Sequence, residues 1–188
     1  MRKLGMELER EINIANEYYR DNQIALIYKK PTPVQIVRVN YPKRSRAKII
    51  EAYYKTPSTT DYNGIYKGHY IDFEAKETNS KTSFPLANIQ PHQIKHLKQV
   101  FLHKGTAFII FKWVYYQKTY VMDLKYILPW YTSGRKSIPY SAFLKDAYQI
   151  KTEDIPCLNY LKCVDKMIGE QELDDFFFTN QWFEECDY

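Results

Sequence analysis

Asp61, Glu74 and Lys76 are the residues of this sequence whose types and spacing best suit chemistry. Two carboxylates that share a pocket suit a hard divalent cation such as Mg²⁺, which takes oxygen ligands and also accepts the phosphate oxygens of a substrate. Such a metal stabilises developing negative charge and helps to generate hydroxide from bound water. A lysine beside the pair would reach the attacking water or the phosphoryl oxygens. These three residues therefore predict a hydrolytic site that uses Mg²⁺, or Mn²⁺ as its substitute.

A β-hairpin must position these side chains. Residues 70–76 alternate in polarity, which is the period of a β-strand, with Ile71, Phe73 and Ala75 on one face and Asp72, Glu74 and Lys76 on the other. A turn at Lys67-Gly68 would bring Asp61 back antiparallel and nearly level with Glu74. Asn63-Gly64 is a competing turn signal, and an exposed hairpin with an ordinary Glu/Lys pair is the alternative interpretation.

A basic stretch precedes this hairpin. No Asp or Glu occurs from Asn22 to Ile50, whereas seven Lys and Arg do, and three prolines exclude a helix. Residues 34–39 and 49–54 are rich in Val, Ile and Tyr, which favours two extended arms over a disordered basic loop. A basic hairpin here suits a DNA-engaging prong better than a part of the core. Its candidate phosphate contacts are Lys43, Arg44, Arg46 and Lys48, and its candidate stacking residues are Tyr41, Tyr53 and Tyr54.

Charge and length also bear on function. Seven of the 22 acidic residues follow Met167, where no Lys or Arg occurs, so residues 1–167 carry 27 basic and 15 acidic residues, a net charge of +12. A body this positive indicates a polyanionic partner. We expect one domain over residues 1–168, with the hairpin inserted at about 31–57, followed by an acidic, aromatic tail at 169–188.

Five short stretches between residues 29 and 86 are more distinctive than the bare Glu-x-Lys pattern. They are Lys29–Val37 (KKPTPVQIV), Tyr41–Ser45 (YPKRS), Ser58–Gly64 (STTDYNG), Ile71–Thr78 (IDFEAKET) and Lys81–Leu86 (KTSFPL). Together they resemble the RecU family of bacterial Holliday-junction resolvases, over roughly residues 4–165. The resemblance implies an α/β fold of the restriction-endonuclease-like class, with a mixed central sheet flanked by helices and a projecting basic β-hairpin, the stalk.

The resemblance also implies an activity. A homodimer would cut two strands of a four-way junction symmetrically during recombination and DNA repair, and would contact a recombinase. Thr59 and Gln93 match family positions that give oxygen ligands to the metal beside Asp61 and Glu74. Two alternatives remain open at this point: another nuclease of the same fold, of flap or restriction type, and a DNA-binding module without catalysis.

Several further expectations follow from the sequence. Three cysteines without a C-x-x-C pair indicate free thiols in a reducing cytosol, and no apolar run is long enough for a membrane span. The DNA-acting function that the resemblance implies predicts a cytoplasmic, nucleoid-associated protein. Glu9, on a helix expected at 5–21, is a further candidate for the site. His92 and His96 are spaced for zinc, but solvated histidines on the helix expected at 91–103 are the preferred interpretation. We expect further strands at 106–112 and 119–124, and further helices at 141–147 and 158–168.

Overall fold

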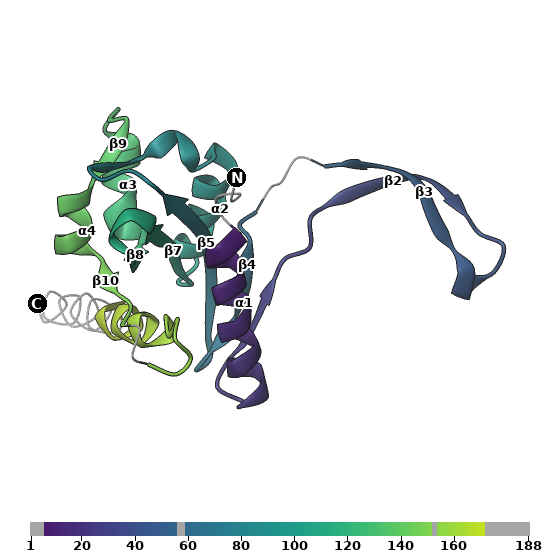
Figure 1. Cartoon of the computed structure of the whole chain (residues 1–188), viewed down its shortest axis with the longest axis horizontal. Coiled ribbons are helices and arrows are strands. Elements are labelled where there is room, and N and C mark those ends of the chain that lie inside the picture. Colours follow the sequence, from purple (N-terminus) through teal and green to yellow (C-terminus); the bar gives the residue numbers. More distant parts are fainter. Residues whose placement is uncertain (1–5, 56–58, 152–153, 172–188) are drawn as a thin grey trace, which may run out of the picture.

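A six-stranded mixed sheet organises the chain (Figure 1). The computed structural model describes residues 6–55, 59–151 and 154–171, except the side chain of Arg44. The strand order is β1-β4-β5-β7-β8-β10. These strands are β1 (Leu26–Lys29), β4 (Tyr62–Tyr66), β5 (His69–Thr78), β7 (Thr106–Trp113), β8 (Lys118–Asp123) and β10 (Tyr148–Gln149).

Strands β4 and β5 form the predicted hairpin. Their register pairs Tyr62 with Phe73 and Tyr66 with His69. The turn lies at Lys67 and Gly68, whose φ angles of 49° and 84° are both left-handed, as a tight hairpin turn requires. Strand β5 then pairs in parallel with β7, and helix α2 (Pro91–Leu102) lies between them in the chain. The parallel pair makes the sheet mixed, which confirms the predicted fold class.

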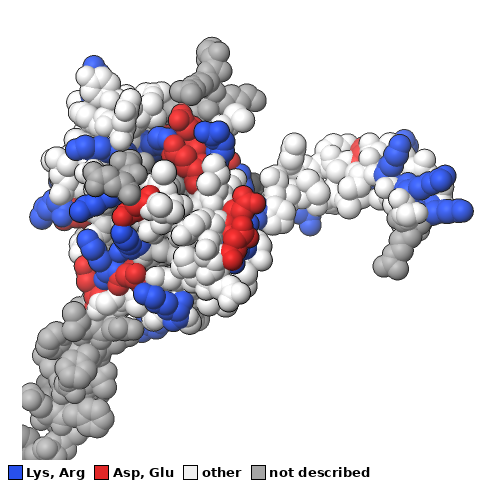
Figure 2. All heavy atoms as spheres, turned by 60° about the horizontal axis from the view of Figure 1, so that its bottom comes forward, with Lys and Arg blue, Asp and Glu red and all other residues white. Residues whose placement is uncertain are grey.

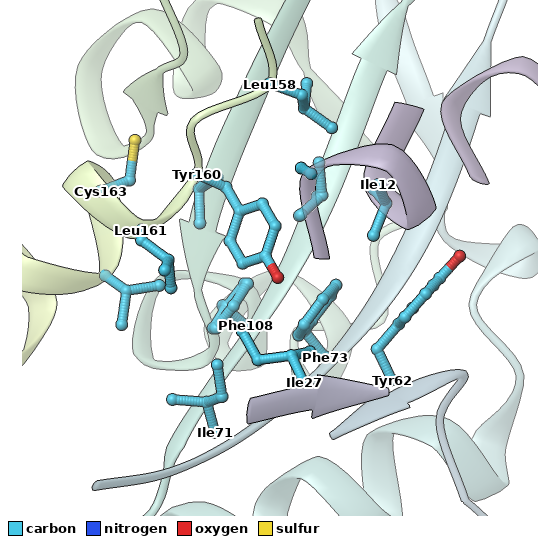
Figure 3. Packing of buried hydrophobic residues seen from close by; sticks show 14 of the residues in the cluster. Ile12, Ile27, Tyr62, Ile71, Phe73, Phe108, Leu158, Tyr160, Leu161 and Cys163 are labelled. Carbon is cyan, nitrogen blue, oxygen red and sulfur yellow. The ribbon is translucent and has the colours of Figure 1, made fainter. Parts of the chain in front are cut away.

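One face of the sheet is covered by α1 (Met6–Asp21) and by the helical residues 161–171. Its core holds stacked aromatic rings, in which Phe73 lies 4.9 Å from Tyr62 and 4.8 Å from Phe108 between ring centroids (Figure 3). Tyr160 packs on Phe73 from the side of the second helix. Burial of these rings and the surrounding aliphatic side chains fixes the apolar face of β5, so the opposite face must carry Asp72, Glu74 and Lys76.

The other face is covered by α2, α3 (Leu124–Thr132) and α4 (Tyr140–Asp146), which share a second apolar core. Strand β7 contributes to both cores, with Phe108 and Ile110 in the first and Ile109 and Phe111 in the second. Helix α2 therefore lies on the same side of the sheet as the polar face of β5. Among the described residues, no helix is long and apolar enough to cross a membrane.

The stalk is the second sheet of the molecule. Strands β2 (Val34–Asn40) and β3 (Lys48–Tyr54) pair antiparallel, and a 3₁₀ turn (Arg44–Arg46) lies between them. Figure 1 shows this hairpin projecting away from the body. Every side chain of β2 is exposed, so the body gives it no core. The predicted projecting hairpin is confirmed.

Some elements differ from the expectations. The last helix starts at 161 rather than 158 and reaches 171, the last described residue, so the rest of the predicted tail lies outside the described residues. Helix α3 was not predicted, because Pro129 lies inside it. Residues 83–85 form strand β6 (Ser83–Pro85), which pairs with β9 (Ser137–Pro139). Two 3₁₀ turns, Leu86–Asn88 and Val114–Tyr116, complete the described elements.

Candidate active site

The structure brings Asp61 and Glu74 together as the hairpin register predicted. Tyr62 of β4 pairs with Phe73 of β5. Because the strands are antiparallel, Asp61, which precedes Tyr62, lies level with Glu74, which follows Phe73. The backbone N–H of Lys30 donates to the Asp61 carbonyl at 2.7 Å, which continues the pairing beyond the end of β4. The Asp61 carboxyl group is close enough to help raise the pKa of Glu74. Two carboxyl groups therefore share one pocket beside the sheet.

Burial dominates the electrostatics of this pair. Only 2 % of the Glu74 side chain is exposed, and this burial raises the pKa of Glu74 to about 8. The charge of Lys76, whose Nζ lies 3.2 Å from Glu74 Oε1, opposes the rise, whereas Asp61 adds to it. Among the described residues, Glu74 Oε2 is a buried oxygen without a hydrogen-bond partner. Burial thus disfavours the charged form of Glu74 unless a cation neutralises it, which suits a bound cation.

Thr59 precedes Asp61 by two residues, and Gln93 lies on α2, on the same side of the sheet as the polar face of β5. The Thr59 hydroxyl is half-buried and donates to the Thr60 carbonyl at 3.3 Å. Gln93 is buried in the first turn of α2, where its Oε1 accepts a hydrogen bond from the Gln90 N–H at 2.9 Å in a capping box. That oxygen keeps a second lone pair. Sequence reasoning from patterns alone offered no signal for either residue.

Glu9 takes a different partner. Its Oε2 lies 2.6 Å from Lys29 Nζ, and both side chains are more than one third exposed. Glu9 is thus part of a surface ion pair between α1 and β1, and its contribution to the site stays a prediction.

Sequence reasoning missed a buried polar cluster beside the carboxylate pair. Asp72 is completely buried, and its carboxylate accepts hydrogen bonds from Lys30, Thr60 and Tyr70. His96 Nε2 lies 2.9 Å from the same carboxylate, so the expectation of a solvated His96 is wrong. One sequence feature could have indicated this cluster. Asp72 is a carboxylate on β5, and helices cover both faces of the sheet, so Asp72 needs buried partners. No group of three His, Cys, Asp or Glu side chains in the described ranges is arranged to hold a metal ion.

The candidate DNA-contacting residues gather at the far end of the stalk (Figure 2). Lys43, Arg46 and Lys48 are all exposed there, and the Arg44 side chain lies outside the described part. The three tyrosines expected to stack on bases are exposed too, by 62 % for Tyr41, 61 % for Tyr53 and 84 % for Tyr54. The stalk therefore presents its cations and Tyr41 at the far end, whereas Tyr53 and Tyr54 pair with Gln35 and Val34 at the end nearer the body.

Comparisons with known proteins identify the family of this chain. Residues 3–166 match the family model described as "RecU: Recombination protein U". The chain is 50 % identical over 171 residues to the Holliday junction resolvase RecU of Lactococcus lactis subsp. cremoris (strain MG1363), covering 90 % of this chain and 80 % of that protein. It is 50 % identical over 167 residues to the Holliday junction resolvase RecU of Geobacillus kaustophilus (strain HTA426), with 87 % and 84 % covered.

A solved structure also aligns with the fold, that of Hjc, a Holliday junction resolvase from Archaeoglobus fulgidus. The TM-score is 0.46 at 10 % identity, over 76 % of this chain and 93 % of Hjc. The family assignment depends instead on the family model and on the half-identical relatives, which cover nearly all of the described body. This chain belongs to the RecU family.

Proposed function

We propose that this protein is a structure-selective endodeoxyribonuclease that resolves four-way DNA junctions. The observation that carries the proposal is the level pair of Asp61 and Glu74 with Lys76 beside it. This cluster occurs in a chain that is half identical to proteins named Holliday junction resolvase RecU. Paired carboxylates with a neighbouring amine suit phosphodiester hydrolysis, because the reaction needs a polarised water and an offset for the charge on phosphorus.

The residues of the site fit a magnesium ion. Asp61 and Glu74 would hold it, with Thr59 and Gln93 as neutral oxygen donors, and Mn²⁺ would substitute. The buried, unpartnered Glu74 Oε2 supports this assignment, since a buried acceptor without a partner is costly unless a cation or a donor meets it. When bound, the metal supplies charge stabilisation at the scissile phosphate and an acidified water.

Lys76 has its own part in the reaction. Its side chain is largely buried, with 17 % exposed. An ion pair of 3.2 Å between Lys76 Nζ and Glu74 Oε1 holds the ammonium at the edge of the carboxylate pair. From there it would orient the attacking water in line with the leaving oxygen and offset negative charge on the phosphoryl oxygens. The electrostatic interaction of a fixed cation with the phosphoryl oxygens is stronger in a pocket that excludes water than in solvent.

The stalk and the symmetry of the protein would provide junction selectivity. The exposed cations at the stalk end would contact phosphates around the open centre of the junction, so shape rather than base sequence would be recognised. A homodimer would place two sites on two strands of like polarity, which matches substrate symmetry to protein symmetry. Contact with a recombinase and a nucleoid-associated, cytoplasmic location complete the proposal.

Cleavage of a synthetic immobile four-way junction in Mg²⁺ tests this function. Wild-type protein should nick the junction in preference to a flap or a plain duplex, and chelation should stop the reaction. Lys76→Ala should lower the cleavage rate by about 10²–10³-fold while junction binding persists. Lys67→Ala is the matched control, because Lys67 lies on the same hairpin but pairs with Asp165 at the surface. Equal cleavage by both variants, or cutting of flaps in preference to junctions, would contradict the proposal.

A further inference from the structure

Asp72 is the most heavily hydrogen-bonded carboxylate of the described chain, yet the proposed reaction does not use it. Its Oδ2 lies 2.7 Å from Lys30 Nζ, 2.8 Å from the Tyr70 hydroxyl and 2.9 Å from His96 Nε2. Its Oδ1 accepts from the Thr60 hydroxyl. The carboxylate is completely buried, so none of these bonds is shared with solvent. Three donors and the His96 ring nitrogen around one buried anion fix its position and theirs.

The partners of Asp72 lie on both sides of the stalk in the chain. Lys30 follows β1 directly and begins the segment that leads into the stalk, whereas Thr60 follows it and precedes Asp61. Lys30 Nζ also lies 2.9 Å from the Thr60 hydroxyl, and the Lys30 N–H donates to the Asp61 carbonyl. The two segments that lead into and out of the stalk are therefore hydrogen bonded to each other through Lys30 and Thr60, and both residues are hydrogen bonded to Asp72.

The other two partners connect the same carboxylate to the catalytic elements. Tyr70 lies on β5, and its hydroxyl accepts from Asn63 of β4 at 3.2 Å. His96 lies on α2, one turn after Gln93. Asp72 itself lies two residues before Glu74, and side chains two apart in a strand share a face. One anion thus connects the base of the stalk, the strand of Glu74 and the helix of Gln93.

We propose that Asp72 is a positioning residue that fixes the stalk in one orientation relative to the carboxylate pair. It holds Lys30 and Thr60, and through them it places Asp61 level with Glu74. This inference rests on the proposed function in naming the carboxylate pair as the hydrolytic site, but the orientation it describes exists without DNA or metal.

The chemistry of the cluster explains why a carboxylate is needed at this place. An asparagine has the same shape, but its NH₂ group donates where Asp72 only accepts, and it carries no charge to hold Lys30. Lys30 is 18 % exposed and so has a path to solvent when its partner is neutral. Its departure would release the first residue of the stalk segment and the bond that it makes to Thr60.

The test compares Asp72→Asn with Asp165→Asn, which removes a partly exposed carboxylate paired with Lys67. Spin labels on cysteines at Ser45, at the stalk end, and at Glu17, on α1, report the stalk-to-body distance by pulsed electron resonance. The background replaces Cys157 and Cys186 with serine and the buried Cys163 with alanine, and excess unlabelled chain isolates distances within one copy. Measurements are made without metal and without DNA.

Asp72→Asn should broaden the distance distribution beyond that of Asp165→Asn. With junction DNA and Mg²⁺, its single-turnover rate at saturating junction should fall by about 10–100-fold, as expected for misplaced reacting groups. Its junction affinity in chelator should stay within about threefold of wild type. Thr60→Val removes one hydroxyl only and replaces Asp72→Asn in every assay if that variant does not fold.

An unchanged distance distribution in the variant would overturn the inference, whatever happens to cleavage. A slower rate with an unchanged distribution would assign Asp72 to the local site alone, and would overturn it too. If wild-type protein failed to cut junctions, the proposed function would fall, while the distance measurement would still decide whether Asp72 orients the stalk.

Discussion

Replacing Glu74 with glutamine should stabilise the metal-free fold at neutral pH while it removes cleavage. Burial raises the pKa of Glu74 from 4.5 to about 8. Between these values the unfolded chain has lost the proton that the folded chain still holds, so unfolding releases a proton. The free energy of unfolding of the wild type therefore falls as the pH rises from about 4.5 to about 8. Glutamine has no proton to release, so the variant escapes this loss.

The size of the effect follows from linkage. Inside this window, each pH unit lowers the free energy of unfolding of the wild type by at most about 1.4 kcal/mol. Going from about pH 5.5 to about pH 7, the variant should gain at most about 2 kcal/mol on the wild type. Because Glu74 is 2 % exposed, screening by solvent reduces this value little. A difference of this size is a sizeable part of the stability of a typical domain. The wild type would be less stable by that amount because its site needs the carboxylate.

Urea unfolding in chelator, followed by tryptophan fluorescence, measures the difference. Trp113 is buried in the body and reports loss of its core. Both proteins are compared at one concentration and at the same pH values, with Asp165→Asn as the control for removing a carboxylate. A difference between Glu74→Gln and wild type that stays constant from about pH 5.5 to about pH 7 would refute the reasoning.

Three further predictions concern other parts of the molecule. Gly64→Ala should destabilise the fold by about 1–3 kcal/mol in urea unfolding, because its Cβ would lie 2.1 Å from the Leu26 carbonyl oxygen; Gly169→Ala, with nothing within 4 Å, should not. Lys43→Gln should reduce the slope of log affinity for junction against log salt by about 0.9 in binding titrations, whereas Lys118→Gln on β8 should leave it unchanged. Mg²⁺ at about 100 times its dissociation constant should add about 2.7 kcal/mol to wild-type stability, and Asp61→Asn should lose most of that gain.

The hairpin that carries the site was predictable, because its signals are local. Alternation along residues 70–76 fixed the faces of β5, and Lys67-Gly68 supplied a turn. The competing signal at Asn63-Gly64 has another cause. Gly64 lies where the β1 backbone approaches closely, and a Cβ would collide with it. A glycine at a turn and a glycine at a close approach look alike in a sequence.

The Asp72 cluster was not predictable, because it depends on contacts between distant parts of the chain. Lys30 is 42 residues from Asp72 and His96 is 24 residues away, and no periodicity connects them. The pairing of β6 with β9 is of the same kind, since only the tertiary fold brings residues 83–85 beside 137–139. Local patterns predict elements and their faces, whereas long-range polar contacts require the packed structure.

The stalk hairpin has a geometric consequence for the separation between contact and cutting. In the described chain, β2 and β3 form a sheet of two strands, apart from the six strands of the body. Two residues added to each arm would preserve which way every side chain faces and would move the tip outward by about 7 Å. The distance between the stalk tip, which would contact DNA, and the site that would cleave it can therefore change in steps, by insertions that leave the cores of the body unchanged.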